Sequence, residues 1–387
     1  MKVNINNKNI TSLTEINWNE YCDEITELYC NNNQLTNLIG CPNTLEILYC
    51  WNNQLTSLVG CPNTVKELCC DINQLTTLAG CPNSVKVLHC DHNQLTNLVG
   101  CPNTLKNLYC SYNQLTSLVG CPNTLEELVC DNNQLTSLVG CPNTVKKLYC
   151  HVNLLKTLVE CPNKLEKLHC STNQLTSLVG CPNTVKILNC NDNNLTSLVG
   201  CPNSVKGLDC SNNRLTTLEG CSKSIIKLIC GGYNNFTTLQ GCPNSVVQLH
   251  CNKCSNLKSL KGCGNSVKAL HCSGSQLLTT LEGCPNSVEY LNCDDNSKLT
   301  SLQGCSYNIQ YLICKQWSLS NEWKDLTFEQ IKDKLFNMQV ENFIRNRSAR
   351  IIQNAWEQYY YIPNKNTNET LYIKRLIERG ELPIATN

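Results

Sequence analysis

The residues of this chain that could do chemistry are its cysteines, which number 32 in 387 residues. Thiols in such number could form disulfides, bind metal ions or act as nucleophiles. Nearly all of them belong to two regular series. One series holds Cys30, a Cys every twenty residues from Cys50 to Cys230, and then Cys251, Cys272, Cys293 and Cys314. The other runs from Cys41 to Cys221 in the same steps and continues with Cys242, Cys263, Cys284 and Cys305, which leaves Cys22, Cys69 and Cys254 outside both series.

The cysteines recur because the chain is one twenty-residue unit written many times. The copy at 101–120 reads CPNTLKNLYCSYNQLTSLVG, and its inner part follows the pattern L-x-x-L-x-C-x-x-N-x-L-x-x-L. This is the leucine-rich repeat pattern with Cys in place of one Leu. From residue 230 onward the period lengthens to 21, and the extra residue falls in the turn that follows the strand. The sequence therefore predicts a solenoid, in which each coil buries its apolar face against its neighbours.

Each coil can be assigned from the side chains of this copy. Residues 107–111 are predicted to form a strand that directs Leu108 and Cys110 inward and Asn107, Tyr109 and Ser111 outward. Asn113 follows at the turn, where its amide can satisfy backbone groups that stacking would bury. Proline at the start of each copy opposes helix, so we expect an extended or turn-like return segment. In the longer coils Ser255, Gln276 and Ser297 are expected at the Asn position, with Asn256 or Asn296 as nearby substitutes.

This arrangement leaves two interpretations of the thiols. In the first, both series are small apolar residues of the core and stay reduced, as free buried Cys usually does. In the second, they form a disulfide or metal framework. Side chains stacked in parallel have poor geometry for disulfides, and the polar start MKVNINNKNITSL lacks the apolar core of a secretion signal, so the first interpretation is favoured. Cys251-x-x-Cys254 has no matching second pair, and His250 and His271 have no third ligand nearby, so no metal site is expected.

The composition divides the chain into three predicted parts. Residues 1–29 form an N-terminal cap with one degenerate repeat, residues 30–316 form the solenoid, and residues 317–387 form a helical C-terminal cap or tail. The fold class is thus a β-rich solenoid of about sixteen coils with a parallel sheet on its concave face, an extended or turn-like convex side and an α-helical tail. In the tail, apolar spacing predicts helices from about 328 to 338, 348 to 360 and 371 to 380. They either cover the open end of the sheet or form a separate interaction module.

The repeat resembles the short, bacterial-type leucine-rich repeats of secreted effector proteins, in which an N-x-L-x-x-L stretch leads into a Leu-Pro pair. Here Asn113-Gln114-Leu115-x-x-Leu118 leads into Val119-Gly120-Cys121-Pro122. The Cys-Pro-Asn-Thr/Ser version and the Asn-rich composition are similar to leucine-rich repeat proteins of giant, mimivirus-like amoeba viruses. Some bacterial proteins of this repeat type carry a ubiquitin ligase with a Cys nucleophile. That activity is not carried over, because the tail after Cys314 contains no thiol.

The outward side chains of the strands vary most between copies and would line the concave surface. Aromatic residues on a rigid sheet are good interface anchors, whereas the alternative is that Tyr is merely tolerated in strands. We expect a protein to bind here through Tyr29, Tyr49, Trp51, Glu67, His89, Tyr109, Glu127, Tyr149 and His169. Acidic residues dominate the first half of this surface, and Lys147, Lys167 and Lys227 follow in the second.

Other classes of function find little support in the sequence. A formal net charge of +1 does not predict a nucleic-acid partner, and no stretch is apolar enough to predict a membrane span. No nucleotide-binding, metalloprotease or serine-hydrolase motif occurs, so neither an enzyme nor a cofactor is expected. Calmodulin is not expected to bind the Ile352-Gln353 segment, because Glu357 stands where a basic residue is wanted.

We therefore predict a protein-interaction scaffold that binds a host protein in the host cytoplasm. The alternative is a structural or virion-associated repeat protein without a dedicated ligand.

Overall fold

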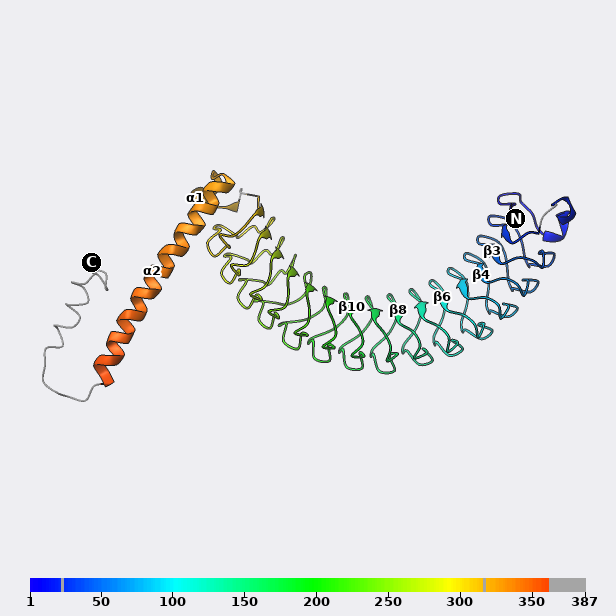
Figure 1. Cartoon of the computed structure of the whole chain (residues 1–387), viewed down its shortest axis with the longest axis horizontal. Coiled ribbons are helices and arrows are strands. Elements are labelled where there is room, and N and C mark those ends of the chain that lie inside the picture. The colour runs from blue at the N-terminus through cyan, green and yellow to red at the C-terminus, as the bar shows by residue number, and fades with distance from the viewer. Residues whose placement is uncertain (22–23, 316–317, 362–387) are drawn as a thin grey trace.

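The chain forms one long curved solenoid with a helix at its C-terminal end (Figure 1). The structure is a computed structural model that describes residues 1–21, 24–315 and 318–361, with side chains only to residue 353 in the last helix. Its strands lie along the inner side of the arc (Figure 1), so the sheet is the concave face, as the repeat pattern predicts.

Every coil contributes one short strand to a single sheet of sixteen strands, ordered from β1 to β16 along the chain and parallel throughout. Each strand has three residues rather than the five predicted at 107–111. The register joins equivalent residues of successive copies, for example Leu108 with Leu128. The strands are β1 Lys2–Asn4, β2 Glu27–Tyr29, β3 Ile47–Tyr49, β4 Glu67–Cys69, β5 Val87–His89, β6 Asn107–Tyr109, β7 Glu127–Val129, β8 Lys147–Tyr149, β9 Lys167–His169, β10 Ile187–Asn189, β11 Gly207–Asp209, β12 Lys227–Ile229, β13 Gln248–His250, β14 Ala269–His271, β15 Tyr290–Asn292 and β16 Tyr311–Ile313.

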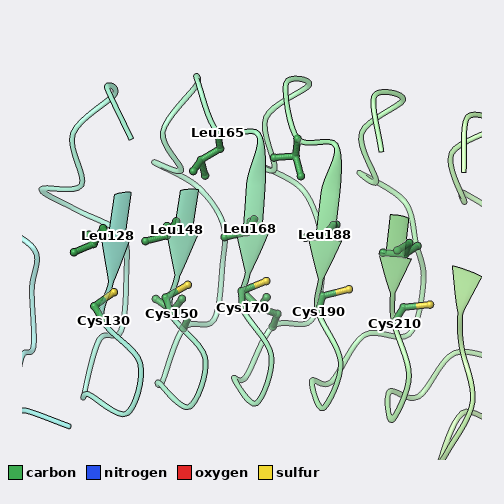
Figure 2. Close-up of a cluster of buried hydrophobic side chains, with 14 of the residues drawn as sticks. Leu128, Cys130, Leu148, Cys150, Leu165, Leu168, Cys170, Leu188, Cys190 and Cys210 are labelled. Atoms are coloured by element: carbon green, nitrogen blue, oxygen red, sulfur yellow. The ribbon is translucent and has the colours of Figure 1, made fainter. Parts of the chain in front are cut away.

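The core is a set of ladders of identical side chains. In the coil of β6, Leu105, Leu108, Cys110, Leu115 and Leu118 are all fully buried. Figure 2 shows the leucine and cysteine ladders from Leu128 and Cys130 onward, with the sulfur atoms of successive coils pointing the same way. This parallel stacking is the arrangement that disfavours disulfides, and every described cysteine is a free thiol.

The buried asparagine of each coil connects its backbone to the preceding coil. The Asn113 Nδ2 donates to the carbonyl oxygens of Cys90, Cys110 and Ser111 at 3.0, 3.1 and 3.2 Å. Its Oδ1 accepts the N–H of Leu95, in the preceding coil, at 2.9 Å. Asn113 therefore satisfies groups that stacking would leave buried and unpaired, as predicted. The prediction that Ser111 points outward is wrong, because this residue is buried as the chain enters the turn.

In the first 21-residue coil Asn234 keeps the ladder position, donating to Cys210 O and Cys230 O at 3.0 Å. In the next three coils the ladder lies one residue earlier than predicted, and of the two substitutes named for it Asn296 is the one used. The buried positions are taken by Cys254, Ser275 and Asn296, and not by Ser255, Gln276 and Ser297. Asn296 reproduces the bonds of the regular ladder, donating to Cys272 O at 3.2 Å and Cys293 O at 2.7 Å. The Cys254 thiol lies 3.9 Å from Cys230 O, and the buried Ser275 Oγ has no hydrogen-bond partner in the described part of the chain. The C-terminal coils are thus joined by fewer side-chain hydrogen bonds.

Glycine is favoured at the turn that ends each copy, because φ is positive there and because the backbone of the preceding coil leaves little room for a side chain. Gly140 has a φ of +88°, and a Cβ placed on it would lie 2.4 Å from the backbone nitrogen of Val119 in the preceding coil. Glu160 occupies the equivalent position one coil later with a φ of +71°, so this coil carries a side chain where the backbone favours glycine.

Both ends of the core are covered. At the N-terminus, Val3 and Ile5 continue the apolar ladders, and two short 3-10 helices, Leu13–Glu15 and Trp18–Glu20, follow. At the C-terminus come α1, Asn321–Lys324, and α2, Phe328–Tyr361. Trp323, Ile331 and Leu335 are buried against the last coils.

The helical prediction for the tail needs two corrections. The helices expected at about 328–338 and 348–360 are one continuous helix, because no residue between them breaks the α-helical backbone. The packed part of the helix includes Phe336, whose ring lies 5.9 Å from that of Tyr307, while Val340, Phe343 and Ile344 further along are exposed. The helix expected at about 371–380 lies outside the described residues.

Candidate binding face

The residues predicted to bind a partner all lie on the sheet side of the solenoid. Eight of them belong to strands, and Trp51 lies two residues after the end of β3. Each one is partly exposed, because its neighbours on adjacent strands cover its flanks while its outer surface meets solvent. The nine residues are Tyr29, Tyr49, Trp51, Glu67, His89, Tyr109, Glu127, Tyr149 and His169.

The aromatic residues of this face form stacked pairs across neighbouring strands. The rings of Tyr29 and Tyr49 are 4.8 Å apart, and those of His89 and Tyr109 are 4.3 Å apart and nearly parallel. Stacking restrains the side chains before any partner arrives, which lowers the entropic cost of binding. The Tyr49 hydroxyl also donates to Glu67 Oε1 at 2.6 Å, and this bond raises the pKa of Tyr49.

Several acidic groups of the first half have a cationic partner on the same face. Glu27 lies 3.9 Å from Lys2, and Glu127 lies 3.1 Å from the Lys147 Nζ. The Asp131 Oδ1 is 2.6 Å from the His151 Nδ1. The predicted division into an acidic half and a basic half is therefore weakened by ion pairs between adjacent coils.

Two carboxylates at β4 and β5 have no such partner. Within residues 1–21, 24–315 and 318–353, no Lys or Arg forms an ion pair with Asp71 or Asp91. A backbone N–H of the following coil binds each of them, with Asp91 N 2.7 Å from Asp71 Oδ1 and Ser111 N 2.5 Å from Asp91 Oδ1. Burial and the neighbouring charge of Asp71 raise the pKa of Asp91 to about 6. Negative charge is thus concentrated at this point of the face.

That these side chains come together was not predicted from the sequence. The register pairs Cys69 of β4 with His89 of β5. Asp71 and Asp91 follow them by two residues, so Asp71, His89 and Asp91 come together, with Cys69 beside Asp71. The signal was present as Cys69-x-Asp71 and His89-x-Asp91, twenty residues apart.

Most ladder cysteines have a raised pKa, whereas hydrogen bonds with Cys305 and Cys293 lower the pKa of Cys284 and Cys314. Burial raises the pKa of Cys61 and Cys161, on the return segment, to about 12. The pKa of Cys110 in the strand ladder is raised further by burial. Because the thiolate is the reactive form, these groups are inert in the folded chain at neutral pH. Cys254 is likewise fully buried, and Cys22 lies outside the described residues.

His250 and His271 do come together as their shared position predicts. Their rings stack at 4.2 Å, and Tyr290 continues the stack 5.0 Å from His271. Burial lowers the pKa of both imidazoles. In the part of the chain that the structure describes, no third His, Cys or acidic group joins them as a metal ligand.

Exposed apolar side chains form a second surface, in the turns outside the sheet. The residue before the turn glycine is a valine or isoleucine in most coils, and the eight such residues are between 43% and 67% exposed: Ile39, Val59, Val99, Val119, Val139, Val159, Val179 and Val199. Glu219 ends the row. None of the helices in the described ranges has the length and apolar character needed to span a bilayer.

Comparison with known proteins identifies the architecture. No family model matches the chain, and no curated protein is significantly similar to it. Among solved structures, YopM of Yersinia pestis, described as a leucine-rich effector protein, is 25% identical with a TM-score of 0.60, over 75% of this chain and 83% of YopM. YopM of Yersinia enterocolitica is 24% identical with a TM-score of 0.58, over 75% of this chain and 68% of its own.

A third similar structure is the functional domain of InlJ from Listeria monocytogenes, which includes a cysteine ladder. It is 24% identical with a TM-score of 0.55, over 80% of this chain and 66% of the InlJ chain. The structural neighbours are thus leucine-rich repeat proteins, and the fold is a leucine-rich repeat solenoid.

Proposed function

We propose that this chain is a protein-interaction scaffold without catalytic activity, which binds a protein partner on the concave face between β2 and β9. The observation that carries the proposal is the set of preformed aromatic pairs on a rigid sheet, Tyr29 with Tyr49 and His89 with Tyr109. Half-buried aromatic side chains that are already restrained supply large contact area at small entropic cost, which is the property of interface hot spots. The variable outer positions rest on an almost invariant core, so this face can change without loss of the fold.

The similarity to YopM, described as an effector protein, supports a partner in another organism's cells. Together with the resemblance of the Cys-Pro-Asn repeat to proteins of giant amoeba viruses, it leads us to place the partner in the cytoplasm of an infected host. The unpaired carboxylates Asp71 and Asp91 favour a partner with basic residues opposite β4 and β5.

The proposal is tested by affinity purification from infected amoebae with three forms of the tagged full-length chain. One is unmodified, one carries Tyr49→Ser, Trp51→Ser and Tyr109→Ser, and the control carries Val99→Ser, Val119→Ser and Val139→Ser outside the sheet. A host protein that binds the first and third forms, but not the second, supports the concave face. Binding that persists in the second form and disappears in the third contradicts it.

The alternative is a structural or virion-associated protein, and the same purification distinguishes it. Enrichment in purified particles, with no host protein recovered by any form, favours the alternative. The stacked apolar core, which gains stability from each added coil, is the feature that suits it.

A further inference from the structure

Three potential metal ligands converge on the concave face at β4 and β5, and a cysteine lies beside them. Asp71, His89 and Asp91 each offer one ligand atom, and these atoms all lie within 4.8 Å of one another. These distances are close to the spacing of ligands around a single metal ion, whose bonds are about 2.0–2.3 Å long. Cys69 lies beside this group, with its Sγ 3.1 Å from the Asp71 Oδ2. Its thiol is not within 4.8 Å of all three of the other ligand atoms, so it would have to move toward them to become a fourth ligand.

The position of these residues in the repeat brings them together without any special loop. Cys69 and His89 occupy equivalent places in adjacent strands, and Asp71 and Asp91 occupy equivalent places just after them. Cys69 is the only cysteine of the chain at this strand position, where other copies have Tyr, His, Val, Asn, Asp or Ile. The thiol therefore departs from both core ladders and stands beside three other donors.

The electrostatics of this site call for a cation. Asp131, the next acidic residue of the same ladder, contacts the His151 Nδ1 at 2.6 Å. Asp71 and Asp91 have no ion pair with Lys or Arg within the described ranges, and they are adjacent to each other. A divalent ion would neutralise both carboxylates at once.

The donor set selects the kind of ion. A thiolate and an imidazole are soft or intermediate ligands that suit zinc, whereas calcium and magnesium are bound by oxygen alone. Parts of the surrounding structure would also hold the ligands in place. The Tyr109 ring stacks on His89, and the backbone N–H groups of Asp91 and Ser111 fix one oxygen of each carboxylate. Such outer contacts orient metal ligands in known sites.

We propose that Cys69, Asp71, His89 and Asp91 bind one zinc ion on the concave face. On binding, the Cys69 thiol releases its proton to solvent and forms the Zn–S bond, while a ring nitrogen of neutral His89 and one oxygen of each carboxylate complete four-coordination. The site lies within the surface assigned to the protein partner. Its existence does not depend on that assignment, because the ligands all come from this chain.

The test is titration of the purified, reduced, chelator-treated full-length chain with Zn²⁺ by calorimetry, and with Co²⁺ by absorption spectroscopy. We expect one equivalent of metal and a thiolate-to-cobalt charge-transfer band. Two variants are compared, Cys69→Ser with His89→Asn at the site, and His250→Asn with His271→Asn as a control on the same sheet. The site variant is expected to lose at least tenfold in affinity and the whole charge-transfer band, and the control to match the unmodified chain.

Two results would overturn the proposal. One is the absence of metal binding by the unmodified chain. The other is equal binding by the site variant, which would assign the metal to other thiols among the 32. X-ray absorption on the unmodified chain with one equivalent of zinc keeps the test independent of variant folding. One sulfur with three nitrogen or oxygen ligands is expected, and four sulfur ligands would refute the site.

Discussion

Replacing the ladder asparagine Asn113 with alanine tests most sharply how the coils are joined. The Leu95 N–H has the Asn113 Oδ1 as its hydrogen-bond acceptor at 2.9 Å, and Leu95 is fully buried. The three carbonyl oxygens that accept from Asn113 fare better, because each keeps another donor: Asn93 Nδ2 for Cys90 O, Asn133 Nδ2 for Cys110 O and the His92 N–H for Ser111 O. The variant therefore leaves the Leu95 N–H without its acceptor and removes one hydrogen-bond donor from each of the three carbonyl oxygens.

The magnitude follows from this inventory. Leaving one buried N–H unsatisfied costs roughly 1–3 kcal/mol, and losing three shared hydrogen bonds adds about 1 kcal/mol. We expect Asn113→Ala to lower the free energy of unfolding by about 3 kcal/mol. Because each coil interacts mainly with its neighbours, the loss should be concentrated in the coils of β5 and β6.

The assay combines urea denaturation followed by circular dichroism with hydrogen exchange followed by mass spectrometry. Exchange of the peptide that contains Leu95 should accelerate in the variant, while peptides near β14 should not change. The matched control is Gln114→Ala, since the Gln114 side chain is exposed and only its backbone N–H, bonded to Leu95 O at 2.9 Å, takes part in the ladder. An Asn113→Ala variant no less stable than Gln114→Ala would refute the ladder as the joint between coils.

Three further predictions concern single positions. Ser275→Asn should raise the free energy of unfolding by about 1 kcal/mol, because an amide there can donate to Cys251 O and Cys272 O as the regular ladder does; a lower urea midpoint would contradict this. Glu160→Gly should also stabilise the chain by about 1 kcal/mol, since φ at Glu160 is +71°, whereas the same change at Val159 should destabilise it; equal effects of the two changes on melting temperature would count against the strain. Burial lowers the pKa of both His250 and His271, and His250 also interacts with His271, Lys227 and Asp209. The unfolded chain therefore binds more protons just below pH 6.5, so the stability they contribute is present above that pH and is lost as the pH falls. An NMR titration that places both imidazoles at or above pH 6.5 would contradict this sign.

Most of the fold could be predicted from the sequence because every copy of the repeat predicts the same strand, turn and return segment. A Leu or Cys that recurs every twenty residues has one arrangement that buries it, which is a stack of strands in register. Within the regular copies the predictions failed only at the end of the strand, where Ser111 is buried, and the other failures lie where the repeat changes. In two of the 21-residue coils Cys254 and Ser275 occupy the ladder position. The inserted residue follows that position there, whereas it was expected to precede it. The single long helix α2 was predicted as two helices, although Val340, Phe343 and Ile344 continue the helical spacing of apolar residues between the two predicted segments.

The candidate site was predicted only as far as single residues. The outward direction of Tyr49, Glu67 and Tyr109 follows from strand alternation, and the structure has all three partly exposed on the sheet. The strand register was not used to ask which outward side chains lie next to one another. The register places residues twenty apart side by side, as it does Tyr49 with Cys69 and Cys69 with His89. Applied to the outward side chains, this pairing would have predicted the ion pairs, the stacked rings and the candidate metal ligands.

The binding role of the concave face is tested most directly by crosslinking from defined positions in infected amoebae. A photoreactive amino acid is placed in the coil of β6, either at Tyr109 on the sheet or at Val119 in the turn outside it. Both positions are partly or fully open to solvent, so each can report a partner that approaches. We predict a covalent adduct with a host protein from position 109 and none from position 119. An adduct from position 119 alone, or from neither position, would contradict binding through this face.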